Sequence, residues 1–110
     1  MEYFETINAA VTVCDMNGTI IYMNDRSGEI FQNDGGKLLI GQSLFDCHPE
    51  PALTKLKEML ATGRTNVYTI EKNGKKKIIY QSPWRKDGAV AGLVEMSYEL
   101  PDAMEHFVRQ

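Results

Sequence analysis

The hydrophobic and polar positions of this chain follow two different periods, and the changes between them divide it into three parts. In the first part, Ala10–Cys14 and Thr19–Met23 are rich in β-branched residues, which predicts two strands. Asn17-Gly18 between them is a strong signal for a tight hairpin turn. A short helix over Glu2–Asn8 is expected before them, because its apolar residues recur at helical spacing.

The middle part has helical periodicity. Asn24 or Asp25 can cap a short helix that runs to Phe31. A longer helix is expected over 49–62, with Pro49 at its first position and Gly63 as the left-handed residue after its end. Its apolar stripe consists of Leu53, Leu56, Met59 and Leu60.

The last part returns to strand patterns. Asn66–Lys72, Lys75–Trp84 and Ala89–Tyr98 read as three strands. Asn73-Gly74 and Asp87-Gly88 separate them and are typical of hairpin turns. These segments therefore predict three strands that pair antiparallel in sequence order.

The order of elements predicts an α+β domain in which helices cover one face of a five-stranded antiparallel sheet. A chain of 110 residues corresponds to one domain, whose core is expected over about 7–100 with short terminal helices on either side. The second of these helices would begin at Pro101-Asp102. Its expected apolar face consists of Met104, Phe107 and Val108.

Composition excludes several classes of function. The net charge of −3 and the pI of about 5.3 argue against a nucleic-acid surface, which requires a basic face. No apolar run is long enough for a membrane span, and the acidic N-terminus differs from a secretory signal, so a cytoplasmic location is expected. No nucleophile–base pair, paired-carboxylate motif or phosphate loop is present, so no enzymatic activity is expected.

Three stretches of the chain resemble the PAS domain, the sensory fold of many bacterial regulators. Residues 7–24 resemble its opening, in which an apolar strand leads into Asp15-Met16-Asn17-Gly18, a second strand and Asn24. Residues 40–44 resemble the step before its long helix, and residues 92–100 resemble its closing strand. One departure is Glu99-Leu100-Pro101, where the family often has Asp-Ile-Thr. The resemblance implies either a small-ligand pocket between helices and sheet or a ligand-free dimerisation and protein-interaction module.

The resemblance also reduces the number of candidate cofactors. Flavin-binding members carry Asn-Cys-Arg-Phe-Leu-Gln after the second strand, whereas Asn24-Asp25-Arg26-Ser27 stands here, which argues against flavin. Photoactive yellow proteins attach a chromophore to a cysteine close to the position of Cys47, but Met23 stands where they have a chromophore-binding phenol.

Haem is the cofactor implied by His48-Pro49-Glu50, which resembles the His-Pro-Glu step of carbon-monoxide-responsive haem PAS regulators. Pro49 forces the residue before it into an extended conformation, which can hold the His48 imidazole at a helix entrance. His48 is thus the candidate iron ligand, and its alternative is a histidine that bonds a loop carbonyl. Candidates for a second axial ligand are Tyr68, Tyr80 and Met96, and the related haem regulators use a methionine roughly where Tyr68 falls.

The predicted pocket lies between helix 49–62 and the sheet. Its expected lining is His48, Leu53, Leu56, Leu60, Tyr68, Ile70, Ile78, Tyr80 and Met96, although simple core packing explains the same alternation. A homodimer is expected, with an interaction surface formed by Phe4, Trp84 and the C-terminal apolar face. Signalling would proceed through the terminal segments to an effector protein or a fused output domain.

Overall fold

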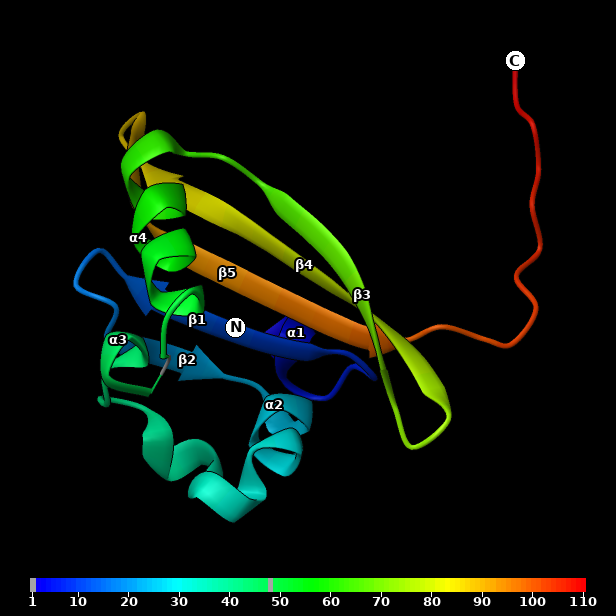
Figure 1. Cartoon of the computed structure of the whole chain (residues 1–110), viewed down its shortest axis with the longest axis horizontal. Coiled ribbons are helices and arrows are strands. Elements are labelled where there is room, and N and C mark those ends of the chain that lie inside the picture. The colour runs from blue at the N-terminus through cyan, green and yellow to red at the C-terminus, as the bar shows by residue number, and fades with distance from the viewer. Residues whose placement is uncertain (1, 48) are drawn as a thin grey trace.

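The computed structural model describes residues 2–47 and 49–110, apart from the side chain of Cys47. It contains one antiparallel five-stranded sheet with the strand order β2-β1-β5-β4-β3, which confirms the predicted α+β class (Figure 1). The strands are β1 (Ala10–Asp15), β2 (Ile20–Met23), β3 (Asn66–Lys72), β4 (Lys75–Lys86) and β5 (Ala89–Glu99). The first and last strands meet at the centre, because β1 pairs with β5 along its whole length.

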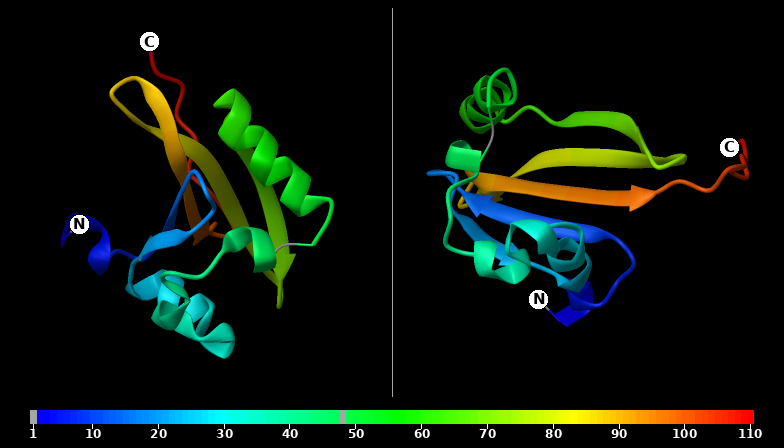
Figure 2. Two further views of the ribbon diagram at one scale, coloured as in Figure 1. Left: turned by 90° about the vertical axis from the view of Figure 1, so that its left-hand side faces the viewer. Right: turned by 60° about the horizontal axis from the view of Figure 1, so that its bottom comes forward.

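The helices lie on both sides of this sheet but are unequal in extent. They are α1 (Glu2–Glu5), α2 (Asp25–Ile30), α3 (Leu44–Cys47) and α4 (Ala52–Thr62), with the 3₁₀ turns η1 (Gln32–Asp34) and η2 (Gly36–Leu39) between α2 and α3. The segments from α2 to α4 form a helical layer over one face, and α1 lies on the other side of the sheet (Figure 2). No helix among the described residues is long and apolar enough to cross a membrane.

The strand register assigns every sheet residue to one of two faces. Thr12 is opposite Glu95, and Glu95 is opposite Gln81, so these three side chains share one face. We call it the inner face, because it carries the hydrophobic core formed with α4. The core consists of Cys14, Leu56, Met59, Leu60 and Leu93. The alternate residues point to the opposite, outer face.

Asn24 joins three parts of the fold and is completely buried. Its side-chain oxygen accepts hydrogen bonds from the N–H groups of Val11 at 2.9 Å and Ser27 at 3.0 Å. Its amide nitrogen donates to the carbonyls of Phe4 and Ala9, both at 2.8 Å. The predicted cap of α2 is therefore confirmed, and it also ties the N-terminal segment to β1.

Helix α4 begins three residues later than predicted. The sequence suggested Pro49 as the first helical residue, but the helix starts at Ala52, with Pro51 as its N-cap. The reason is the second proline, which excludes Glu50 from the helical conformation. Glu50 instead accepts hydrogen bonds from the N–H of Thr54, at 2.7 Å, and from its hydroxyl.

The C-terminal helix that was predicted after Pro101 is absent. Residues 101–110 are exposed, contain no helix or strand, and extend away from the sheet (Figure 1). A short helix is marginal in water without packing of its apolar face. Met104, Phe107 and Val108 are all exposed, so this stabilisation is missing.

Candidate ligand-binding site

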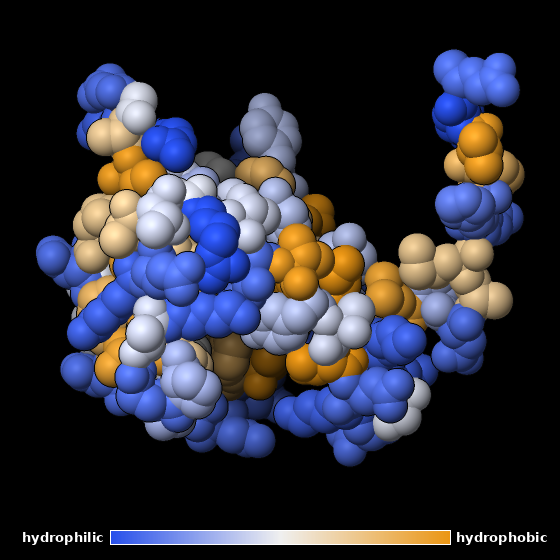
Figure 3. All heavy atoms as spheres, turned by 45° about the horizontal axis from the view of Figure 1, so that its top comes forward, coloured by the Kyte–Doolittle hydropathy of each residue, from blue (hydrophilic) through white to orange (hydrophobic). Residues whose placement is uncertain are grey.

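A cavity of about 540 Å³ separates the helical layer from the inner face of the sheet. Its apolar lining comes from both layers. The main apolar residues are Ile20, Met23, Phe31, Leu39, Leu44, Leu56 and Leu93. Figure 3 shows apolar atoms recessed behind more hydrophilic ones on the face where α4 and β3 lie. The short helical turns between α2 and α3 contribute Asp34 and Leu39 to the lining.

Polar side chains on three adjacent strands form a hydrogen-bonded row on the sheet wall of the cavity. Asn66 of β3 donates from Nδ2 to Oε1 of Gln81 at 3.0 Å. Gln81 of β4 donates from Nε2 to Oε2 of Glu95 on β5 at 2.8 Å. Gln81 is only 8% exposed, and both Gln81 and Glu95 line the cavity. The row therefore ends in a carboxylate that faces the cavity.

The charge of Glu95 affects the groups around it. The pKa of the Tyr68 phenol is raised, first by burial and then by the negative charge of Glu95. The pKa of the Cys14 thiol is also raised, mainly by burial, with smaller contributions from Asp15 and Glu95. Both groups are therefore held neutral at pH 7, so neither supplies a second charge to this wall.

The remaining polar groups of the lining lie nearer the helical layer. Thr12 shares a hydrogen bond of 2.5 Å with Ser27 of α2, which connects the sheet to that helix. Asp34 of η1 lines the cavity and is exposed. Over residues 2–47 and 49–110, no group of three histidine, cysteine or acidic side chains could hold a metal ion.

Comparison with known families identifies the fold. The model of the PAS fold family matches residues 4–103. The chain belongs to the PAS fold family. No curated protein sequence matches it significantly.

Solved PAS structures share its architecture at low sequence identity. VqmA bound to DPO superposes with a TM-score of 0.67 at 19% identity, covering 92% of this chain and 56% of VqmA. The PAS domain of the histidine kinase ThkA has a TM-score of 0.67 at 14% identity, covering 84% of this chain and 99% of that domain. A sensory box histidine kinase from Vibrio cholerae has a TM-score of 0.66 at 15% identity, covering 91% and 88% respectively. These likenesses extend over the whole PAS domain and show its fold.

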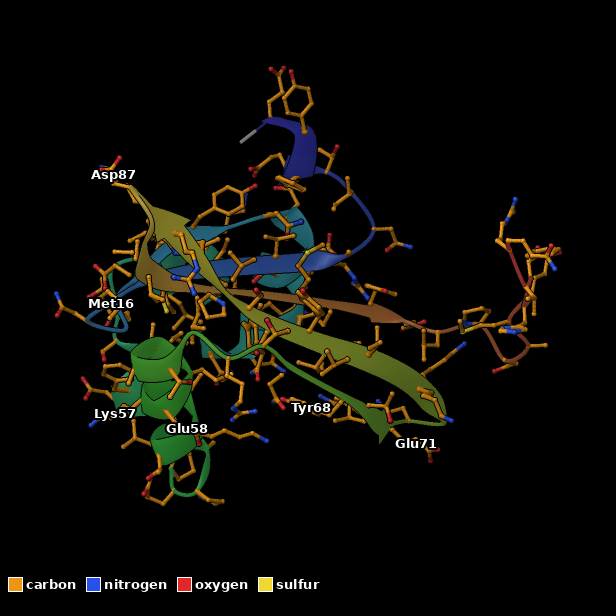
Figure 4. The ribbon with its side chains drawn as sticks, turned by 90° about the horizontal axis from the view of Figure 1, so that it is seen from above. Met16, Lys57, Glu58, Tyr68, Glu71 and Asp87 are labelled. Carbon is orange, nitrogen blue, oxygen red and sulfur yellow. The ribbon has the colours of Figure 1, made fainter. Side chains whose placement is uncertain are left out.

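The residues predicted to line the pocket are only partly brought together in this PAS domain. Leu56 lines the cavity, whereas Leu60 belongs to the adjacent core and Leu53 is half-buried on α4. Tyr68 and Ile70 lie on the inner face of β3, as their register with β4 requires, and both are partly exposed. Figure 4 shows Tyr68 on the side of the sheet where α4 lies.

Three predicted residues lie on the other face of the sheet. Tyr80 is opposite Met96 in the pairing of β4 with β5. Tyr80 comes directly before one residue of the polar row, and Met96 comes directly after another. Because adjacent residues of a strand point to opposite faces, both side chains project from the outer face. Ile78 has the same parity as Tyr80 on β4 and shares that face. The predicted lining therefore combined residues that the register places on opposite faces. His48, the candidate iron ligand, lies outside the described residues, and its contact with any ligand stays a prediction.

The polar row was not predicted from the sequence. Glu95 was available as a signal, since it is a charged residue within a mainly apolar strand, whereas Gln81 lies in a strand with many polar residues. Whether these two side chains reach the cavity depends on the face of the sheet that they occupy. The pairing of β4 with β5 sets that face, and the pattern of either strand alone does not.

Proposed function

We propose that this chain is a PAS sensory module that binds a small organic ligand between the helical layer and the inner face of the sheet. The observation that carries this proposal is the cavity of about 540 Å³. Its size lies within the range of roughly 300–1,000 Å³ that is usual for ligand pockets. A mainly apolar lining with a few convergent polar groups is also typical of such pockets.

The position of the cavity suggests how binding would reach the rest of the molecule. Leu93 and Glu95 line the cavity from β5, the strand that leads directly into residues 101–110. A ligand that favours one arrangement of β5 would shift the populations of this C-terminal segment. The signal would then pass to an effector protein or a fused output domain.

The structural neighbours support a sensory role for the fold. VqmA is described as bound to DPO, and another structure of it as a complex with ligand and DNA. The ThkA match is the PAS domain of a histidine kinase. This chain spans about half of VqmA, so the activities of the whole protein are not transferred to it.

Leu39→Trp tests whether the cavity is the binding site. Leu39 lines the cavity from η2, whereas the adjacent Leu38 is 84% exposed and serves as the matched control. Ligand-observed NMR with small aromatic alcohols and amines should detect binding to the wild type. Binding should weaken at least about tenfold in Leu39→Trp because the indole fills the cavity, and it should persist in Leu38→Trp. Equal binding by all three proteins would place the site elsewhere.

Haem bound through His48 is a more specific form of the same proposal. Of the three candidates for a second axial ligand, Tyr68 alone lies on the inner face, because Tyr80 and Met96 project from the other side. The described residues that line the cavity include two carboxylates, and none of them has a basic side chain to pair with haem propionates. A non-haem ligand is therefore favoured.

An absorption spectrum tests the haem form directly. We expect purified protein mixed with haem to show no Soret band that shifts under carbon monoxide. A band that shifts, and that is lost in His48→Ala but kept in His106→Ala, would establish haem ligation by His48 instead.

A ligand-free interaction module is the second candidate function, and the outer face of the sheet favours it. Val67, Tyr80 and Tyr98 are 51%, 41% and 40% exposed on that face. An exposed group of apolar and aromatic side chains is typical of a protein-interaction surface. The interaction surface alone does not exclude ligand binding, since the cavity lies on the opposite face of the sheet.

A further inference from the structure

We infer that the cavity selects a small amine: a mainly apolar molecule with one protonated nitrogen, which binds the carboxylate of Glu95. This inference rests on the proposed function, since it names the chemical class of the ligand for the same cavity. It follows from the direction of the hydrogen bonds, from the charge of the lining, and from the shape of the apolar space.

The polar row presents an acceptor to the ligand rather than a donor. Asn66 donates to the amide oxygen of Gln81, which uses that oxygen within the row. The amide nitrogen of Gln81 in turn donates to Oε2 of Glu95. Each amide is thus oriented by its neighbour, and the row terminates at a carboxylate with only acceptor capacity at pH 7.

One oxygen of this carboxylate is available. Glu95 has a single hydrogen bond among the described residues, through Oε2, and Oε1 makes none there. No side-chain oxygen or nitrogen in the described part of the chain is both buried from solvent and without a partner, so Oε1 is accessible. A ligand in the cavity can therefore reach it.

No lysine, arginine or histidine among the described residues forms a salt bridge with Glu95. The salt bridges found among residues 2–47 and 49–110 all lie elsewhere: Arg26–Glu29, Lys37–Glu5, Lys37–Asp25 and Arg64–Glu58. Among the described residues that line the cavity, the only other charged one is Asp34, which is also acidic. An anionic ligand would be repelled by both groups, and a cationic one would be attracted.

The apolar part of the lining completes the specificity. Leu56 and Leu93 lie beside the polar row, and Phe31 and Leu39 close the cavity from the helical layer. A charge-assisted hydrogen bond to this carboxylate is stronger than a hydrogen bond between two neutral groups. An amine with an aromatic or short aliphatic body fits both parts of the cavity. Its ammonium group would bind the carboxylate, and its body would contact the apolar lining.

Three probes that share one body test this inference: 2-phenylethylamine, 2-phenylethanol and 3-phenylpropionate. Their dissociation constants are measured at pH 7 by NMR titration of the ¹⁵N-labelled chain. We expect the amine to bind about tenfold more tightly than the alcohol, because its ammonium group adds a charge–charge attraction to the hydrogen bond that the hydroxyl also donates. The carboxylate should bind most weakly of the three.

Glu95→Gln identifies the residue responsible. This variant should lose about tenfold in amine affinity, leave the affinity for the alcohol nearly unchanged, and improve binding of the carboxylate probe. Glu99→Gln is the matched control, because it removes the same charge from the end of the same strand, outside the cavity lining. Urea unfolding of both variants verifies that they remain folded.

The outcomes separate this inference from the proposed function. An amine that binds no more tightly than the alcohol, or a preference that survives in Glu95→Gln, would overturn the inference while leaving a ligand-binding cavity. A wild-type chain that binds none of the probes at millimolar concentration would overturn both.

Discussion

Asn24 connects the N-terminal segment, β1 and α2 through its side chain. It is buried with both side-chain atoms saturated, and its four partners come from the N-terminal segment, β1 and α2. Those partners are backbone groups, and the hydrogen bonds to Val11 and Ser27 are buried, whereas those to Phe4 and Ala9 are partly buried. A buried backbone group without a hydrogen bond costs about 1–3 kcal/mol.

Substituting Asn24 should therefore destabilise the domain strongly. We expect Asn24→Ala to lower the free energy of unfolding by about 3 kcal/mol or more. Asn24→Asp keeps the two acceptor contacts but places a carboxylate against the carbonyls of Phe4 and Ala9, so a similar loss is expected. Urea denaturation measures both. Asn33→Ala, at an exposed position, should change stability by less than about 0.5 kcal/mol.

Gly92 is required by a close approach rather than by its backbone conformation. A Cβ atom at this position would lie 1.9 Å from the carbonyl oxygen of Cys14 and 2.5 Å from Nε1 of Trp84. The same indole nitrogen donates to that carbonyl at 3.0 Å. A side chain at position 92 would thus displace Trp84 and open the pairing of β1 with β5.

Gly92→Ala should lower stability by about 3 kcal/mol, because the strand backbone must shift to relieve this overlap. Trp84 is the only tryptophan, so its fluorescence emission reports the displacement directly. Gly28→Ala is the control, since its Cβ would meet only the flexible side chain of Lys37 within 3.4 Å. Unchanged emission and stability in Gly92→Ala would contradict this role of Gly92.

At the scale of single residues, the sequence predicted roles that depend on neighbouring residues. It did not predict roles that depend on contacts between distant segments. Asn24 was predicted as a helix cap because a cap depends on the next three residues. Its contacts to Phe4 and Ala9 depend on how the N-terminal segment folds back, which no local pattern contains. Gln81 and Glu95 were missed for the same reason.

Among the elements, α4 begins later than expected, and the side chain of Glu50 accepts hydrogen bonds from its first turn. The pKa of Glu50 is lowered, first by the hydrogen bond from the Thr54 hydroxyl and then by that from the Thr54 N–H. A carboxyl whose pKa is lowered in the folded state stabilises that state above its ordinary pKa of 4.5. The contribution is lost as the pH falls through the folded-state value, where the group becomes protonated.

Glu50→Gln should therefore remove part of the pH dependence of stability. We expect the wild type to be more stable than Glu50→Gln at pH 7, by a small amount because the group is exposed. The difference should shrink as the pH falls below 4.5. Midpoints of urea unfolding across this range measure it. Glu105→Gln, which lies in the exposed C-terminal segment, should show no such difference, and a constant gap for Glu50→Gln would contradict the argument.

The elements that were predicted correctly carry strong local signals. The turns at Asn73-Gly74 and Asp87-Gly88 adopt positive φ at both residues, as tight hairpins require, and they set β3, β4 and β5 in sequence order. The helix after Pro101 failed because its periodic pattern has no surface to pack against. Periodicity predicts which face of a helix is apolar, but the partner surface decides whether the helix forms.

For the whole molecule, the decisive contact is the pairing of β1 with β5, which joins the two ends of the chain. The hairpin turns predict the pairs β1–β2 and β3–β4–β5 but leave the relation of these two units open. The order of elements predicted one five-stranded sheet, but which strands of the two units pair was not predicted. The cavity also belongs to this scale, because its walls come from segments between Thr12 and Glu95.

The outer face of the sheet is the surface on which the whole molecule would associate. Val67, Tyr80 and Met96 form one cross-strand row of three adjacent strands, and Ile78 and Tyr98 form part of the next. Helix α1 lies on this side, tied to β2 by the hydrogen bond from the Tyr22 hydroxyl to Glu5 at 2.9 Å. The apolar rows are nevertheless partly exposed.

Tyr80→Lys should weaken self-association if these rows form the interface between two copies. A lysine at the centre of the face would place an unpaired charge in the contact, which costs at least about tenfold in the dimer dissociation constant. Sedimentation velocity over a range of micromolar concentrations measures this constant. Leu38→Lys is the control, because Leu38 is 84% exposed on η2, in the helical layer on the opposite side of the sheet. A wild-type chain that remains monomeric throughout the range, or a Tyr80→Lys variant that associates as the wild type does, would show that this face is not a dimer interface.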